Sequence, residues 1–585
     1  MRLPHSLVWI LLGLSLGLVL LAQEPTQSLR EADAAYREGV AALNRNDLDT
    51  AQARFETVTR LVPAVEQGHS ALGAVLMRKG RWAEGTRELE RALAINPSDS
   101  AAQLNLAMVY GQTEAYAKAI QLFTKLEAEA RTTGHPLAVT VLQAHARCLQ
   151  AIGQTQAAIV PMKLAVAQED RNAELHDELG SLYAIDKNWG PAEQQFSDAL
   201  RLKDDLATAH LHLGLVLSAE QKSGTEEELQ KAYRLAPRDP AIALAAGKAL
   251  ADAGHDREAL PMLQRAVEVK PKSAAAQYQL ALVLQRVDRV REAIEFLKRV
   301  VEAEPRNGEA LTNLGTALAQ AHQAVDGIPF LKRAVGVNPG NATAHQDLAA
   351  AYLQVNQTDD AIAELKTAIK IAPNSPQLHY DLGTAFKLQD DAVDAIPELE
   401  KAERLNPSGY EPAYLLGLLY MQVARYNEAA QQLEIALRLH PKNGEGWSTL
   451  GSVYNKLDRL PEAAKALREA IEQMPEQADS HLILASVLVK QNDVAGAAQE
   501  RKVAADLMRA HMNLQRAEVA TNSGKSLLKQ GKLDDAIVQF HDALAFDPNY
   551  AEAHLQLAAT LDKQGKAADA AVERARGNAL AKQAQ

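Results

Sequence analysis

The sequence predicts an all-α protein, a right-handed α-solenoid in which antiparallel helix pairs stack with a period of 34 residues. Gly or Ala lies ten residues after each proline of a regular series, and a large apolar residue follows three positions later. A fixed period of this size indicates one helix pair that is copied and stacked, because a single pair cannot bury its own apolar face. The prolines that mark the period are Pro237, Pro271, Pro305, Pro339, Pro373, Pro407, Pro441 and Pro475.

Each period contains the elements of a helix–turn–helix. In the first helix the small residue and the large apolar residue share a face, as Gly417 and Tyr420 do. The second helix carries Ala429 and then Leu433, so small and large residues alternate where the two helices meet. Polar residues two positions after the proline are expected to cap the next helix. These are Asp239, Ser273, Asn307, Asn341, Ser375 and Asn443.

The N-terminal segment predicts export. Residues 6–22 form an uncharged apolar run, so residues 1–22 are interpreted as a signal peptide or an N-terminal membrane anchor, with a linker at 23–31. Ala22 suits a cleavage site, but Leu20 is larger than the usual residue there, so both alternatives remain open. The expected location is periplasmic or secreted, or attached to the membrane through residues 6–22.

Repeats account for the rest of the chain. Repeats 1–3 occupy 32–133, repeats 4–14 occupy 139–511, and 517–585 hold repeats 15–16 and a polar C-terminal cap. Five-residue inserts at 134–138 and 512–516 separate these blocks. Residues 494–522 hold almost no helix breaker and predict one lengthened helix, with a kink or a boundary nearby. The predicted repeats start at residues 32, 66, 100, 139, 173, 207, 240, 274, 308, 342, 376, 410, 444, 478, 517 and 551.

The order of residues within the period resembles the tetratricopeptide repeat (TPR). It places a small residue at position 8, an aromatic residue or Leu at 11, Ala at 20, a large apolar residue at 24, Ala at 27 and Pro at 32. Trp447, Leu450, Gly451 and Tyr454 match the first-helix signature of that family. The resemblance implies that a partner segment binds in a concave groove lined by positions 2, 5, 9 and 12 of the first helices.

These positions give the candidate partner-binding groove. Its side chains are mostly neutral and include tyrosines, which offer contact area at a low entropy cost and suit an extended peptide or a sugar chain. The alternative, that these are only tolerated positions of amphipathic helices, stays open. The candidate residues are Tyr278, Thr312, Gln346, Tyr380, Thr384, Lys387, Tyr414, Ser448 and Ser452.

The sequence therefore favours a non-catalytic protein-interaction scaffold outside the cytoplasm. The alternative is an accessory subunit of an envelope polysaccharide or secretion machine, which would bind a glycan or a synthase. A net charge of -12 opposes binding to nucleic acid, and we expect no cofactor and no metal. Histidines that share position 4 are expected to fill the seam between repeats. They are His69, His176, His210, His345, His379, His481 and His554.

Overall fold

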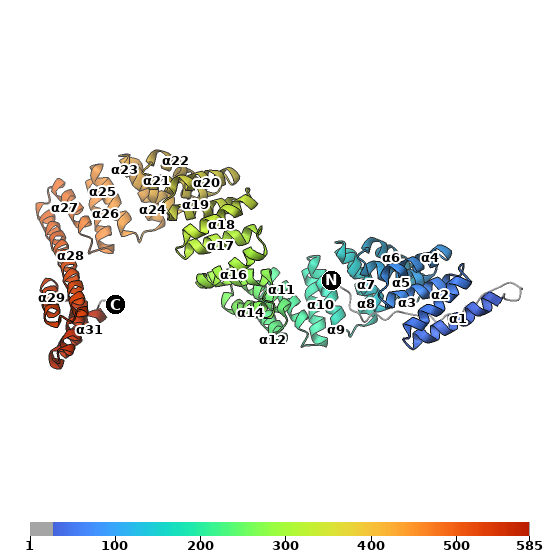
Figure 1. Cartoon of the computed structure of the whole chain (residues 1–585). Helices are drawn as coiled ribbons and strands as arrows, with labels where there is room; N and C mark the ends of the chain where they lie inside the picture. The colour runs from blue at the N-terminus through green and yellow to red at the C-terminus, as the bar shows by residue number, and fades with distance from the viewer. Residues whose placement is uncertain (1–26, 584–585) are drawn as a thin grey trace. The chain divides into compact units, whose positions relative to one another are not determined.

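The computed structural model describes residues 27–583, and its regular structure is entirely helical. The predicted N-terminal segment 1–22 lies outside these residues. Thirty-one helices follow one another within 27–583, and consecutive helices pack in pairs. The prediction of an all-α solenoid of helix pairs is confirmed. The chain divides into two compact units, Met1–Pro305 and Arg306–Gln585. Figure 1 shows the helices in chain order, coloured by residue number.

The first unit contains sixteen helices within its described residues. They are α1 (Gln27–Asn44), α2 (Leu48–Leu61), α3 (Glu66–Arg78), α4 (Trp82–Ile95), α5 (Ser100–Gln112), α6 (Tyr116–Thr133), α7 (Val139–Ala151), α8 (Thr155–Gln168), α9 (Ala173–Ile185), α10 (Trp189–Leu202), α11 (Ala207–Ala219), α12 (Thr225–Leu235), α13 (Pro240–Asp252), α14 (Asp256–Val269), α15 (Ala274–Arg286) and α16 (Val290–Ala303).

The second unit contains the remaining helices of the described chain. They are α17 (Gly308–Gln320), α18 (Ala324–Val337), α19 (Ala342–Gln354), α20 (Thr358–Ile371), α21 (Pro376–Leu388), α22 (Ala392–Leu405), α23 (Tyr410–Gln422), α24 (Tyr426–Leu439), α25 (Gly444–Lys456), α26 (Leu460–Gln473), α27 (Ala478–Lys490), α28 (Val494–Lys529), α29 (Leu533–Phe546), α30 (Ala551–Lys563) and α31 (Ala567–Gln583).

Small residues let the two helices of a pair approach closely, as the sequence predicts. A Cβ atom placed on Gly417 would lie 2.6 Å from Cγ of Leu433, and one on Gly451 would lie 2.5 Å from Cγ of Leu467. Both leucines are fully buried. Position 8 of the repeat is therefore small because the leucine at position 24, which lies in the second helix, occupies the space where a larger side chain would be.

The turn between the two helices has the same backbone in every predicted repeat. The residue at position 15 has a left-handed conformation, with φ between 55° and 84°, at sixteen places from Asn46 to Gly565. Glycine adopts this conformation without strain, and Asn or Asp tolerates it. Most of these residues are polar or glycine, but Ala424 holds φ 60°. This alanine carries a steric cost that its counterpart Gly254 avoids.

The helix starts follow the predicted punctuation. Fourteen predicted repeat starts coincide with the first residue of a helix; the exceptions are residues 32 and 517. All six predicted caps accept a hydrogen bond from the backbone of the helix that follows, as Asn443 does from the Gly446 N–H at 2.9 Å. The capping prediction is confirmed.

The two inserts have different structures. Residues 134–138 form the loop between α6 and α7, and Gly134 ends α6 with φ 73°. Residues 512–516 instead lie inside α28, a continuous helix of 36 residues, so the predicted lengthened helix is confirmed. The boundary between the two compact units falls at Pro305/Arg306 and not at this second insert.

Candidate interaction site on the first-helix face

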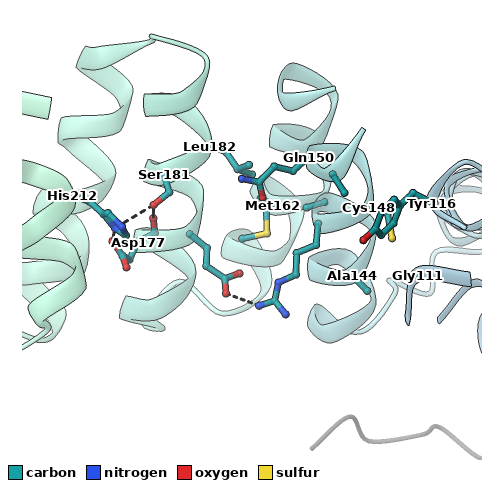
Figure 2. Close-up of a pocket in the computed structure, with 14 residues that line it drawn as sticks. Gly111, Tyr116, Ala144, Cys148, Gln150, Met162, Asp177, Ser181, Leu182 and His212 are labelled. Carbon is teal, nitrogen blue, oxygen red and sulfur yellow. Dashed lines mark hydrogen bonds and ion pairs between the residues drawn. The ribbon is translucent and has the colours of Figure 1, made fainter. Parts of the chain in front are cut away.

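The first helices of neighbouring repeats present one row of side chains, and we call the surface formed by their positions 5, 6, 9 and 12 the first-helix face. In the first unit this face holds a cavity of about 770 Å³. Its lining comes from α5 to α9 and α11, and Figure 2 shows His212, Asp177 and Ser181 at one side and Tyr116 with Cys148 at the other. The cavity is thus lined by residues of four consecutive repeats.

Charged and amide side chains at one edge of the cavity pair across repeats. Gln143 donates from Nε2 to Oε2 of Glu178 at 2.9 Å, and Arg147 Nη2 lies 2.7 Å from Oε1 of the same carboxylate. Gln143 and Arg147 occupy positions 5 and 9 of one repeat, and Glu178 occupies position 6 of the next. Both oxygens of this carboxylate are therefore engaged by the preceding repeat.

The repeat that contains Glu178 pairs with the repeat that follows it through the same positions. Asp177 Oδ1 lies 2.7 Å from Nδ1 of His212, and Ser181 Oγ lies 3.2 Å from that same nitrogen (Figure 2). Asp177 and Ser181 occupy positions 5 and 9, and His212 occupies position 6 of the repeat that follows. In a Ser–His–Asp catalytic triad the serine and the aspartate bond different ring nitrogens. This cluster has a different geometry, because both groups meet Nδ1.

The remaining wall of the cavity is largely apolar. Met162, Leu182 and Cys148 are buried and line it together with Ala144 and Tyr116. Burial raises the pKa of the Cys148 thiol to about 11. The thiol is thus a neutral, poorly nucleophilic group at neutral pH. An apolar surface with a few oriented polar groups is typical of a binding site.

The predicted groove residues lie on successive first helices. Tyr278 is on α15 in the first unit, and the others are on first helices of the second unit. All are partly buried except Lys387, which is exposed. Two of the hydroxyls are occupied by their own helix, since Thr312 donates to the Gly308 carbonyl and Thr384 to the Tyr380 carbonyl, each at 2.9 Å.

Three of these predicted residues contact neighbours outside the predicted set. Gln346 donates to Oδ2 of Asp381 at 2.6 Å, which repeats the pairing of position 5 with position 6 of the next repeat. The ring of Tyr414 stacks on that of Tyr410, with centroids 5.6 Å apart and planes at 16°. Ser448 and Ser480 share a hydrogen bond of 2.8 Å between their hydroxyls.

Two acidic residues at position 6 stand in a partly dehydrated environment. Burial raises the pKa of Asp347 to about 6. Burial also raises the pKa of Asp381, although hydrogen bonds from Gln346 and Gln377 oppose that rise. The groove predicted from the sequence does not include position 6. Comparing position 5 of each repeat with the residue 35 further along, and position 9 with the residue 31 further along, would have found Asp177, Glu178 and His212.

The position-4 histidines fill the seam between repeats, as predicted. His379 lies with Nε2 3.1 Å from the Pro373 carbonyl oxygen and Nδ1 2.6 Å from Oε2 of Glu398. The other six bond the equivalent carbonyl oxygen through Nε2. Trp447 donates its indole N–H to the Pro441 carbonyl at 2.9 Å, so a ring donor at position 4 serves the same purpose. Within residues 27–583 no three His, Cys, Asp or Glu side chains gather in a possible metal site.

Family models match most parts of the chain. Tetratricopeptide-repeat models match residues 36–85, 70–133 and 250–318, and a TPR-repeat model matches 524–565. This chain is a TPR protein. The model described as the C-terminal domain of cilia and flagella-associated protein 70 matches residues 304–518. These matches support the family that the position-by-position pattern predicts.

Several solved structures match this chain, each with a low TM-score. The Cut9 and Hcn1 hetero-tetramer of APC/C is 17% identical with a TM-score of 0.32, over 91% of this chain and 96% of that chain. MamA from Desulfovibrio magneticus RS-1 is 23% identical with a TM-score of 0.28, over 29% of this chain and 95% of that chain. YrrB, described as a TPR protein with an unusual peptide-binding site, is 21% identical with a TM-score of 0.28, over 32% of this chain and 96% of that chain.

No curated protein sequence matches this TPR chain. Among the helices of residues 27–583, none combines the length and the apolar character needed to cross a membrane.

Proposed function

We propose that this TPR protein is a non-catalytic interaction scaffold that binds a segment of a partner protein on its first-helix face. The observation that carries the proposal is the cavity of about 770 Å³ in the first unit, because residues at the repeat positions 5, 6, 9 and 12 line it. A TPR scaffold for protein interaction agrees with the family. The location outside the cytoplasm is part of the proposal and is supported by the apolar run at residues 6–22.

The chemistry of the cavity indicates what the partner presents. Buried Met162 and Leu182 offer an apolar surface, where a partner side chain such as Leu or Phe would be dehydrated. Arg147 and Glu178, which line the cavity, offer a donor and an acceptor that suit the main chain of an extended segment. The partner segment that fits best is therefore extended, with an apolar side chain as its anchor.

The proposal includes the predicted tyrosines of the second unit. Tyr380 and Tyr414 are partly buried, and the stacked pair of Tyr410 and Tyr414 forms a flat aromatic surface. Such a surface also suits a sugar ring, so the alternative of an accessory subunit of a polysaccharide or secretion machine remains a second candidate. Attachment to the membrane through residues 6–22 belongs to the same proposal.

Crosslinking in living host cells tests the function. The full-length chain is crosslinked and the captured molecules are identified. The same experiment is done with Gln150→Trp, which fills the cavity mouth, and with the double variant Tyr380→Ala/Tyr414→Ala. Gln194→Trp, an exposed residue on the second helix α10, is the matched control. We expect one dominant protein that is lost in Gln150→Trp and retained in Gln194→Trp. Capture that neither first-helix variant changes would refute the proposal, and capture of glycan alone would favour the second candidate.

A further inference from the structure

The long helix α28 leaves part of its surface without a packing partner. In a regular repeat the second helix is covered by the first helix of the following repeat, as α26 is by α27. The predicted first helix at 517–529 is instead the continuation of α28 itself, so it cannot fold back over residues 505–516. Of these twelve residues only Leu507 and Asn513 are partly buried, and the others are exposed.

The exposed part of α28 carries an apolar stripe. Met508, Met512 and Val519 are 44%, 49% and 70% exposed, and their spacing places them with Gln515 on one face of the helix. Phe546 at the end of α29 is 38% exposed and borders the same surface. Single exposed apolar residues are common, but a continuous patch of them marks an interaction site.

This stripe borders a hollow between two helices. A cavity of about 570 Å³ is lined by Met512, Arg516 and Val519 of α28 and by Gln539 and Phe546 of α29, among others. The Arg516 guanidinium lies over the Phe546 ring, 5.6 Å from its centroid, which forms one wall. Methionine side chains are flexible and polarisable, so they adapt to an inserted apolar group. A groove between two helices suits an amphipathic helix as its occupant.

The charges around the stripe are basic in an otherwise acidic protein. Residues 501–519 include four basic residues, Arg501, Lys502, Arg509 and Arg516, and two acidic residues, Asp506 and Glu518, whereas the whole chain has a net charge of -12. Asp506 lies 3.7 Å from Arg509. Arg501 and Lys502 are exposed and form no ion pair within the described residues. The acidic lining residue, Asp542, lies on α29 and accepts a hydrogen bond from Gln539 at 3.1 Å.

We propose that the α28–α29 groove is a second docking site, separate from the first-helix face, and that it binds an acidic amphipathic helix of another protein. The apolar side of that helix covers Met508, Met512 and Val519, and its carboxylates face Arg501 and Lys502. Opposite charges on the two surfaces speed association and exclude basic segments. A recessed groove with α29 as its wall favours a helix over a flat lipid surface.

Fluorescence anisotropy with the full-length chain tests this site. The probe is a fluorescein-labelled synthetic helix with Leu at i, i+3, i+4 and i+7 and Glu at the other positions, and a matched helix carries Lys in place of Glu. We expect the Glu helix to bind about tenfold more tightly than the Lys helix, and Met512→Asp or Arg501→Glu/Lys502→Glu to weaken it about fivefold or more. Lys529→Glu, an exposed charge reversal in the last turn of α28, and Gln150→Trp should leave binding unchanged.

Four outcomes would overturn the proposal. They are equal binding of both helices, no binding of the Glu helix, loss of binding in Gln150→Trp, and binding unaffected by Met512→Asp. Sedimentation of the free chain and flotation with anionic vesicles run in parallel. A dimer that Met512→Asp dissociates would assign the groove to a second copy of the chain, and flotation without Glu-helix binding would assign it to lipid.

Discussion

Gln143 and Glu178 are 35 residues apart in the sequence, and their side chains are joined by a hydrogen bond of 2.9 Å. Gln346 and Asp381, in the second unit, repeat this relationship at the same spacing and at 2.6 Å. Asp177 and His212 repeat it again. At these three places, position 5 of one first helix bonds position 6 of the next, so polar side chains of neighbouring repeats are joined on the first-helix face.

The left-handed turn residue Ala424 gives a prediction about stability. Because an alanine at φ 60° is strained, Ala424→Gly should raise the free energy of unfolding by about 1 kcal/mol. Gly254 occupies the same position in another repeat with φ 84°, so Gly254→Ala should lower it by a similar amount. Urea titration followed by circular dichroism measures both. If both substitutions changed the free energy of unfolding in the same direction, the shared turn geometry would be contradicted.

Close approach of the paired helices gives a second prediction. Gly451→Leu should destabilise the second unit by about 1 to 3 kcal/mol, because its Cβ alone would lie 2.5 Å from Leu467. The control is Gly336→Ala in the exposed part of α18, where no atom lies within 4 Å of the added Cβ. Alanine should stabilise that helix by about 0.5 to 1 kcal/mol. Thermal unfolding curves compare the two, and an unchanged curve for Gly451→Leu would refute the predicted repeat frame.

Asp347 predicts a dependence of stability on pH. Its folded pKa of about 6 lies above the ordinary value, so the folded chain holds this proton more tightly than the unfolded chain does. Stability from this group is therefore lost as pH rises from about 4 to about 6, and the loss is complete above that range. Asp347→Asn should be more stable than wild type by about 1 to 2 kcal/mol at pH 7, with little difference at pH 4. Urea midpoints measured across this range test it, and parallel profiles would contradict it.

Cys148 is the sole cysteine and reports on the cavity. With its pKa raised to about 11, the thiol should react with iodoacetamide at least about a hundredfold more slowly at pH 7.5 than in the denatured chain. The rate should rise with pH until about 11. Comparable rates in the folded and denatured chains would show that the thiol is neither buried nor neutral.

Much of the fold could be predicted from the sequence, because the constraints are local and repeated. Gly417 must be small where Leu433 packs, and Asn443 must reach the backbone of the next helix, so both leave a residue pattern at fixed spacing. The polar network around Glu178 leaves a weaker pattern, since Gln, Asp, Arg, Ser and His all serve at its positions. The groove predicted from the sequence therefore includes tyrosines such as Tyr414 but not Tyr410, which lies at position 1 of its repeat and stacks on Tyr414.

The most direct test of the first-helix face is the affinity of the captured partner segment for variants of the full-length chain. Isothermal titration would compare wild type with Gln150→Trp, which fills the mouth of the cavity, and with the matched Gln194→Trp on the exposed side of α10. The account predicts at least about a tenfold loss of affinity for Gln150→Trp and none for Gln194→Trp. Equal affinity for all three chains would contradict it.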